Sequence, residues 1–310
     1  MTAAAFVFPG QASQRAGMAA ELLAEVPAAR PLFQRAGEIL GLDLAEVCTS
    51  GSDHLLTRTD IAQPALLTTC LGWLEALRQR RVMPQITAGH SLGEFSAWVA
   101  AGALAFDEAV RLVRRRGELM EEAAQRRPGG MLAVIGLPDR PVHDICRQAQ
   151  RAGVVVPANY NSPGQVVVSG EPAALEQVIA AVKEAKGRTI PLRVSGAFHS
   201  PLMEDAARSF SELVTALPLA PPAIPVIANF SAEPVTRVEG VQQAMARQMT
   251  SPVLWTDSVR RMIDDGVRLF VEVGPGQVLT RLLPRISPDA RAVAVGTPRE
   301  LEALVEEVSS

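Results

Sequence analysis

The stretch at residues 86–95 reads ITAGHSLGEF and contains the pentapeptide G-x-S-x-G centred on Ser91. A short apolar run precedes the pentapeptide and a helical pattern follows it. Ser91 is therefore predicted in a sharp strand-to-helix turn that holds its hydroxyl out of a sheet. The helix N-terminus beyond it favours the negative charge of an acyl-transfer intermediate. The pattern predicts Ser91 as a nucleophile and the N–H of Leu92 as an oxyanion donor; the alternative is a glycine-rich turn with an incidental serine.

On both sides of this turn, apolar runs closed by Gly or Pro alternate with longer amphipathic stretches, which is the pattern of an α/β layered fold. Strands of the main layer are predicted at residues 4–8, 85–88, 226–229 and 267–273. The residues before Pro9 lack the basic segment and the cleavage region of a signal peptide, and we interpret them as the first strand.

The segment at residues 131–194 has a pattern of its own. It predicts a strand, a helix, a strand, a tight turn at NSPG, a strand, a helix and a final strand. This β-α-β-β-α-β order is that of the ferredoxin-like unit. Turn and linker residues flank the segment, so we predict a small domain at residues 128–195, inserted in a large domain built from residues 1–127 and 196–310. A site assembled from both would lie in the cleft between them.

Composition narrows the classes of function. The chain of 310 residues has 30 Lys and Arg against 33 Asp and Glu, a formal charge of −3, and 48% of its residues are hydrophobic. A folded protein of this composition offers no basic face for nucleic acid or anionic lipid, and no apolar run reaches the roughly 20 residues of a membrane span. The three cysteines are widely spaced, so we expect no disulfide framework and a cytoplasmic setting.

The search for a general base is short, because the chain contains only four histidines. His143 falls on a predicted helix of the small domain, His54 in a loop, and His90 in the serine turn itself. The best candidate is His199, which lies where the small domain rejoins the large one. Without the serine motif, a lone histidine before a helix would be interpreted as a surface or capping residue.

An acidic third member of a hydrolase-type triad is missing from the pattern. Most acids between Ser91 and His199 fall on predicted helices of the small domain, so we expect a Ser–His dyad whose imidazole is oriented by a carbonyl or amide group. A thiol leaving group, with an ordinary pKa of about 8.5, departs with little acid assistance. The pair therefore suits thioesters better than amides.

An arginine lies on the apolar side of a helix predicted at residues 107–124, which Asp107 is expected to cap. At about 100° per residue, the apolar side chains of this helix share the face of Arg116, whereas Arg114 and Arg115 project to the solvated side. A core-facing guanidinium is costly to bury unless it meets an anion. Either Arg116 has an internal partner such as Glu94 or a stem that reaches solvent, or it grips a substrate carboxylate.

The loop after the first predicted strand, FPGQASQ, permits close approach of backbone to a ligand at Gly10. The N–H of Gln11 is therefore a candidate second oxyanion donor, although a tight strand-to-helix turn explains the loop equally well. His143 and Cys146 share a helix face without two further ligands near them in sequence, so no metal site is expected.

Seven ordered segments resemble the malonyl-CoA:acyl-carrier-protein transacylases and the related acyltransferases of polyketide synthesis. They are FVFPGQ, AGHSLGE, VRLVRRRG, NYNSPGQVVVSG, AFHSPLM, RQMTSPVLW and VEVGPGQVL, and together they run over essentially the whole chain. The resemblance implies a large α/β-hydrolase-like subdomain with an inserted ferredoxin-like subdomain, and a site between the two.

Carried over residue by residue, the resemblance implies that Ser91 takes the acyl group and that His199 activates it. It also implies that the amides of Gln11 and Leu92 hold the oxyanion. Stand-alone fatty-acid members usually read GQGSQ where this chain reads GQASQ, a departure at Ala12.

The resemblance also assigns the residues that bind substrate. Arg116 matches the arginine that pairs with the free carboxylate of malonate, and Gln248 matches a glutamine near the histidine, where it would supply the orienting group. Phe198 matches the malonyl-selecting form of polyketide acyltransferases and would narrow the space beside the malonyl α-carbon. We therefore expect malonyl to be preferred to methylmalonyl, a discrimination typically worth about 1 to 3 kcal/mol.

The expected reaction is a ping-pong transfer in which malonyl-CoA acylates Ser91, CoA leaves, and the phosphopantetheine thiol of an acyl carrier protein attacks the ester. No cofactor is expected. The partner is an acyl carrier protein, in fatty-acid synthesis or in a polyketide synthase assembly line. Two alternatives stay open: a serine thioesterase or hydrolase with water as acceptor, and a noncatalytic module that docks carrier proteins.

Overall fold

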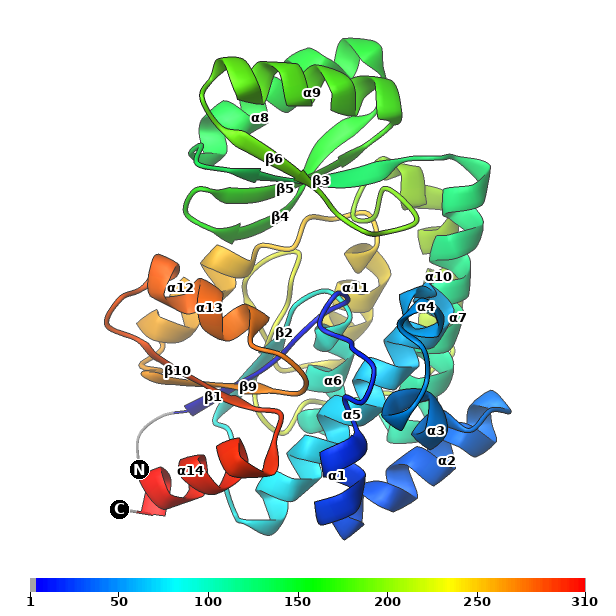
Figure 1. The fold of residues 1–310 in the computed structure, drawn as a ribbon, viewed down its shortest axis with the longest axis vertical. Helices are drawn as coiled ribbons and strands as arrows, with labels where there is room; N and C mark the ends of the chain where they lie inside the picture. The colour runs from blue at the N-terminus through cyan, green and yellow to red at the C-terminus, as the bar shows by residue number, and fades with distance from the viewer. Residues whose placement is uncertain (1–3, 310) are drawn as a thin grey trace.

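The computed structural model describes residues 4–309 and contains two β-sheets (Figure 1). Residues 1–3 and 310 of the predicted large domain lie outside the described residues. The strands are β1 (Ala4–Phe8), β2 (Ile86–Gly89), β3 (Gly130–Ile135), β4 (Val155–Ser162), β5 (Gln165–Gly170), β6 (Arg188–Pro191), β7 (Val226–Ile227), β8 (Pro234–Val235), β9 (Leu269–Val273) and β10 (Arg291–Val295).

Helices cover both faces of the larger sheet and one face of the smaller sheet. They are α1 (Ala20–Glu25), α2 (Arg30–Leu40), α3 (Leu44–Thr49), α4 (Asp53–Thr57), α5 (Thr59–Gln79), α6 (Gly93–Ala100), α7 (Phe106–Arg126), α8 (Asp139–Ala149), α9 (Pro172–Glu184), α10 (Glu204–Thr215), α11 (Val238–Gln248), α12 (Trp255–Asp264), α13 (Val278–Ile286) and α14 (Pro298–Ser309). Single 3-10 turns lie at Pro27–Ala29, Gln150–Ala152 and Pro201–Met203.

The larger sheet has the strand order β10-β9-β1-β2-β7-β8 and is parallel except for the last pair. Alternation along β1 explains its two covered faces, because successive side chains of a strand point to opposite sides. Phe6 and Phe8 enter the main core with α5, α6 and α7, whereas Ala5 and Val7 pack on the other face with α12 and α13. The predicted strands are present, and β8 and β10 are additional strands that the sequence pattern did not reveal.

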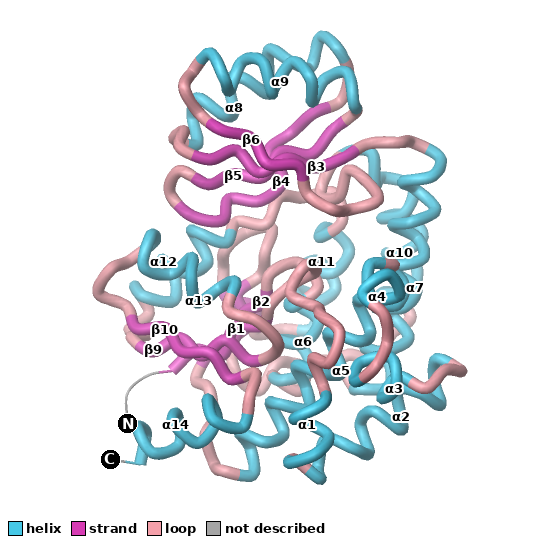
Figure 2. Tube along the Cα trace, in the orientation of Figure 1, coloured by secondary structure: helices cyan, strands magenta, loops and turns pink. Residues whose placement is uncertain are grey.

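The smaller sheet has the order β4-β5-β3-β6 and follows the predicted β-α-β-β-α-β succession from β3 to β6. Figure 2 shows its strands between α8 and α9 on one side and the larger part of the molecule on the other. Leu132 and Val134 of β3 contact the helix side, whereas Met131 and Ala133 join the main core. The domain boundaries at residues 127/128 and 195/196 stay a prediction.

A short backbone contact joins the two parts. Val253 forms a parallel bridge with Asn159 of β4. The N–H of Tyr160 donates to the carbonyl of Val253 at 2.9 Å, and the N–H of Val253 donates to the carbonyl of Ala158 at 2.8 Å. The edge of the small sheet therefore fixes the loop that follows α11.

The predicted cap of the helix around Arg116 is wrong. The helix α7 begins at Phe106, and the residue at its N-cap is Ala105, which makes no side-chain capping bond. Asp107 is therefore the second residue of the helix and not its cap. There Asp107 accepts a hydrogen bond from Arg35 Nε at 2.9 Å. The carboxylate is thus used in an ion pair with α2 while it still lies in the first turn, where the helix dipole favours negative charge.

Within residues 4–309, no helix has both the length and the apolar character that a membrane crossing requires. Cys48, Cys70 and Cys146 are buried and carry free thiols. Burial raises the pKa of each of these thiols, so they are inert protonated groups in the core.

Candidate functional site

Ser91 lies at a tight elbow (residues 89–93) between β2 and α6, in the left-handed region with φ of 51°. The flanking glycines make this turn possible. A Cβ at Gly89 would lie 1.9 Å from the carbonyl carbon of Gly93, and a Cβ at Gly93 would lie 2.1 Å from the carbonyl oxygen of Phe8. Strained backbone of this kind holds a serine hydroxyl at the top of a sheet.

The loop after β1 lies against this elbow. Because β1 and β2 are parallel and Phe8 pairs with Gly89, their carboxyl ends meet at the same edge of the sheet. A Cβ at Gly10 would lie 2.5 Å from the carbonyl oxygen of His90, so only glycine permits this approach. In the described part of the chain, the N–H groups of Gln11 and Leu92 donate to no protein acceptor. Both predicted oxyanion donors are thus available at the same edge.

His199 lies within hydrogen-bond distance of the nucleophile, although the two residues are 108 positions apart in the sequence. Its Nε2 lies 2.7 Å from Ser91 Oγ. Its Nδ1 faces two backbone carbonyl oxygens, that of Gln248 at 2.9 Å and that of Ser251 at 3.1 Å. Carbonyls only accept, so the hydrogen belongs on Nδ1 and Nε2 is free to accept the seryl proton. Carbonyl oxygens therefore stand where a triad acid would stand, and the orienting group from Gln248 is its backbone carbonyl.

Burial, and after it the charge of Arg116, lower the pKa of His199 to about 3. The imidazole is therefore neutral at physiological pH, which is the state that a general base requires. The two carbonyl partners oppose this shift because they stabilise a protonated ring. The imidazolium that forms during proton transfer is held by these same oxygens.

Arg116 is 1% exposed and points into the site. Its NH2 group donates to Ser91 Oγ at 3.2 Å and to Gln248 Oε1 at 2.8 Å, and its NH1 group donates to Gln63 Oε1 at 2.9 Å. The guanidinium also lies over the Phe95 ring, 5.5 Å from the centroid. These partners are neutral, and within residues 4–309 no ion pair includes Arg116. Burial lowers its pKa to about 10, so the charge persists at neutral pH.

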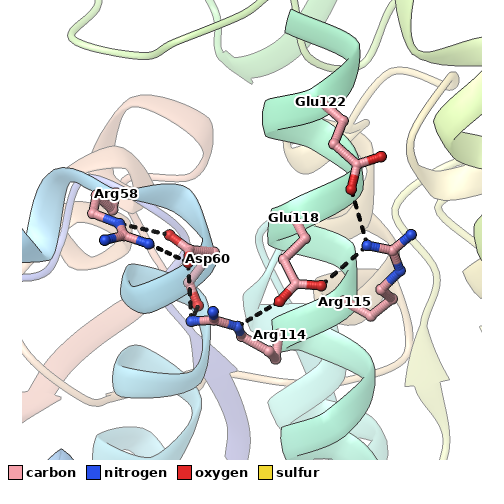
Figure 3. Close-up of polar contacts among 6 residues, drawn as sticks. All are labelled: Arg58, Asp60, Arg114, Arg115, Glu118 and Glu122. Atoms are coloured by element: carbon pink, nitrogen blue, oxygen red, sulfur yellow. Dashed lines mark hydrogen bonds and ion pairs between the residues drawn. The ribbon is translucent and has the colours of Figure 1, made fainter. Parts of the chain in front are cut away.

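The neighbouring arginines Arg114 and Arg115 are partly exposed, and both contact carboxylates (Figure 3). Arg114 pairs with Asp60 at 2.9 Å and with Glu118 at 2.7 Å. Arg115 pairs with Glu118 at 3.1 Å and with Glu122 at 3.0 Å. Of the three consecutive arginines, only Arg116 is thus left with a charge that no carboxylate contacts.

Three residues that sequence reasoning did not select complete the site: Gln63, Asn229 and Ser251. Gln63 on α5 is a fully buried amide in an apolar run, and Asn229 follows β7 and is 1% exposed. A lone amide in an apolar run is a usable signal, since buried polar groups need partners. The contribution of Ser251 is a backbone carbonyl, for which the side-chain type carries no signal.

Phe198 and His90 are both next to a predicted catalytic residue in the chain, and each packs or bonds within the protein. Phe198 is 4% exposed and lies in the main core beside His199 in the chain. His90 Nε2 donates to Asn161 Oδ1 of the small sheet at 2.8 Å, and its ring lies 5.7 Å from that of Trp255. Across the described ranges, no group of three His, Cys, Asp or Glu side chains is placed to hold a metal ion.

The acyl transferase domain family matches this chain over residues 5–307. The chain is also 41% identical over 308 residues to the malonyl CoA-acyl carrier protein transacylase of Bacillus subtilis, a match that covers 99% of this chain and 97% of that protein. The chain belongs to the malonyl CoA-acyl carrier protein transacylase family.

Solved structures agree with this membership of the transacylase family. The chain matches an acyl carrier protein S-malonyltransferase from Vibrio cholerae with a TM-score of 0.95 at 40% identity, covering 98% of this chain and 100% of that one. It matches a malonyl-transacylase solved in complex with its type II PKS acyl-carrier protein with a TM-score of 0.96 at 37% identity, covering 99% and 100%. The predicted family, α/β-hydrolase-like fold with a ferredoxin-like insertion, and acyltransferase class are therefore confirmed.

Proposed function

We propose that this transacylase moves a malonyl group from malonyl-CoA to the phosphopantetheine thiol of an acyl carrier protein through an ester on Ser91. One observation supports the choice of acyl group above all others. The buried guanidinium of Arg116 has only neutral partners and lies 3.2 Å from the seryl oxygen. A buried cation beside a nucleophile gains an anion when a dicarboxylic half-thioester enters, because its far carboxylate pairs with the guanidinium.

In the acylation step, His199 Nε2 takes the proton of Ser91 as the oxygen attacks the thioester carbonyl. The N–H groups of Gln11 and Leu92 are proposed to stabilise the tetrahedral oxyanion, since both are unused donors at the elbow. The intermediate then collapses and CoA leaves as the thiol, with the proton returned by the imidazolium. The Nδ1–H bonds to the carbonyls of Gln248 and Ser251 hold the ring in place throughout.

In the transfer step, the carrier-protein thiol attacks the seryl ester by the same route in reverse. A malonyl-transacylase with 37% sequence identity has been solved with its acyl-carrier protein, which supports a carrier protein as acceptor. The product is the extender unit of fatty-acid or polyketide synthesis. The proposed setting is the cytoplasm, whose reducing conditions suit the free thiols of the core.

Phe198 is proposed to contribute to the choice between extender units. It precedes His199 in the chain and is held rigidly in the core, so its ring limits the space near the acyl α-carbon. One added methyl group is rejected by about 1 to 3 kcal/mol in a pocket of this kind. Malonyl-CoA is therefore expected to react faster than methylmalonyl-CoA.

The test compares Arg116→Ala with the wild type on malonyl-CoA and acetyl-CoA, with a holo-acyl carrier protein as acceptor. Loss of a hydrogen-bonded charge pair is expected to lower malonyl transfer by about 10- to 100-fold while acetyl transfer is retained. Equal losses with both donors would contradict the role of Arg116. Release of free malonate without transfer would favour the hydrolase alternative, and absence of any acyl-enzyme would favour the docking module.

A further inference from the structure

Glu94 is a buried carboxylate three positions after the nucleophile, in the first turn of α6. Each of its oxygens accepts one hydrogen bond. Oε1 accepts from the backbone N–H of Asn229 at 2.7 Å, and Oε2 accepts from Nε2 of Gln248 in a short bond. Burying a carboxylate costs free energy unless hydrogen bonds compensate for the lost water. The two hydrogen bonds to Asn229 and Gln248 therefore indicate which residues Glu94 holds in place.

The first contact, with Asn229, connects Glu94 to the backbone of Gly89 and Ser91. With its main chain fixed by Glu94, Asn229 places its side chain across the elbow. Its Oδ1 accepts from the N–H of Ser91 at 2.7 Å, and its Nδ2 donates to the carbonyl of Gly89 at 2.6 Å. The side-chain amide of Asn229 thus ties Gly89, the first residue of the elbow, to the strained Ser91 within it.

The second contact leads to the other side of Ser91 and to the substrate cation. Gln248 Nε2 donates to the carbonyl of Ser91 at 2.9 Å as well as to Glu94, and Gln248 Oε1 accepts from Arg116 at 2.8 Å. If the amide were turned over, its NH₂ would face the guanidinium and its oxygen would face two acceptors. Glu94 and the carbonyl of Ser91 together therefore determine which end of Gln248 is presented to Arg116.

We propose that Glu94 is a positioning residue for malonyl transfer: it fixes Asn229 and Gln248, which hold the backbone of Ser91 from both sides and keep an acceptor turned toward Arg116. This inference rests on the proposed function and extends it. Glu94 contacts neither the reacting oxygen nor His199, so its effect on the reaction passes through the two amides.

A simpler role for Glu94 is that of a counter-charge. Arg116 is the charged group that faces it, across Gln248, and the nearby His199 is neutral. The two roles predict opposite outcomes when the charge is removed. Without a competing anion, a counter-charge role predicts a lower KM for malonyl-CoA at unchanged kcat. A positioning role predicts a lower kcat, because the nucleophile and the guanidinium lose their alignment.

The decisive variant is Glu94→Gln, which keeps the shape and replaces one acceptor by an NH₂ group. That NH₂ must face either the N–H of Asn229 or Nε2 of Gln248, and both are donors. Acyl-enzyme formation is then followed by mass spectrometry over a range of malonyl-CoA and acetyl-CoA concentrations, which gives kcat and KM for acylation by each donor. We expect kcat for malonyl acylation to fall by about 10- to 100-fold, and the malonyl-to-acetyl ratio of rates to fall with it.

A matched control is Glu272→Gln. Glu272 is equally buried, and its oxygens accept from the N–H groups of Leu279 and Thr280 at the start of α13, away from Ser91. Its loss is expected to lower the unfolding temperature and to leave the malonyl-to-acetyl ratio at the wild-type value. Circular dichroism and thermal unfolding of both variants separate loss of fold from loss of alignment.

Two further variants keep the proposal falsifiable if Glu94→Gln does not fold. Gln248→Met removes the second arm alone and is expected to lower the malonyl-to-acetyl ratio. Asn229→Ala removes the side chain of the first arm alone and is expected to lower acylation by both donors, because the backbone at Ser91 and Gly89 loses its two hydrogen bonds.

An unchanged ratio in Gln248→Met, or a lower KM at unchanged kcat in Glu94→Gln, would overturn the positioning role and leave the proposed function intact. A wild-type protein that forms no malonyl ester would overturn both.

Discussion

The orientation of the Arg116 guanidinium depends on two amide side chains. A long side chain that makes only one hydrogen bond can still adopt several rotamers. Gln63 holds the NH1 group at 2.9 Å and is itself oriented by a contact of its Nε2 with Met120 Sδ at 3.4 Å. Gln63 and Gln248 together hold the guanidinium from two sides.

Gln63→Leu should therefore lower malonyl acylation by about 10- to 100-fold, since a hydrogen bond to a charged group is worth about 1.5 to 3 kcal/mol. Acetyl acylation should change little, because the acetyl group of the thioester has no free carboxylate for Arg116. Rates of acyl-enzyme formation with both donors measure this. Gln63→Leu with parallel losses on both donors would show that the residue supports the fold of the site as a whole.

Ser91, His199 and Arg116 could be selected from sequence because each follows from a local pattern: a pentapeptide, a short list of histidines, and a helical face. The partners of Arg116 could not be selected in this way. Gln63 and Gln248 lie 53 and 132 positions from it along the chain, and only the assembled fold brings them together. Resemblance to the family identified Gln248, whereas its hydrogen-bond partners had to come from the structure.

The loops at the carboxyl ends of β1 and β2 act as one element, because glycine backbones press against each other there. Gly10→Ala should displace the loop that carries the N–H of Gln11, since the added Cβ would meet the backbone oxygen of His90 at 2.5 Å. Complete loss of an oxyanion donor costs about 10²- to 10³-fold in kcat, so a fall in kcat of at least about tenfold is expected.

The matched control for this substitution is Gly130→Ala in β3. Its Cβ would find Leu175 Cδ1 at 3.6 Å, an ordinary contact. Initial rates of malonyl transfer and thermal unfolding of both variants make the comparison. Wild-type kcat in Gly10→Ala would exclude the loop after β1 from oxyanion stabilisation.

At the level of strands and helices, prediction succeeded where periodicity and turn residues were strong. The β3-α8-β4-β5-α9-β6 unit followed from apolar runs separated by NSPG and by amphipathic helices. β10 has the same length as β1 and was missed because only its last two residues are buried and it begins with exposed Arg291. The start of α7 was misplaced because Asp107 is a good capping residue by type, whereas its carboxylate is held by Arg35.

Two buried titratable groups of the site act on the stability of the whole molecule in opposite directions. Burial lowers the pKa of His199 from 6.5 to about 3, so its contribution to stability is present above pH 6.5 and is lost as the pH falls. Burial raises the pKa of Glu94 from 4.5 to about 7, so its contribution is present below pH 4.5 and is lost as the pH rises. Between pH 4.5 and 6.5, the effects of His199 and Glu94 on the pH dependence of the unfolding free energy therefore cancel.

Glu94→Gln removes one side of this balance. On acidification from pH 6.5 to 4.5, the variant should lose unfolding free energy faster than the wild type, by up to about 1.4 kcal/mol per pH unit for one proton. Denaturant unfolding at several pH values in this range gives both slopes, and all other groups are common to the two proteins. Parallel slopes would contradict the opposed titration of His199 and Glu94.

The proposed transfer requires Ser91 to carry the malonyl group as an ester on its way to a carrier-protein thiol. Its most direct measurement is intact-protein mass spectrometry after brief exposure to malonyl-CoA, followed by addition of holo-acyl carrier protein. We predict one malonyl adduct per chain, located on Ser91 by peptide mapping, absent from Ser91→Ala, and passed to the carrier protein. A wild-type chain that stays unmodified, or an adduct that persists in Ser91→Ala, would contradict the account.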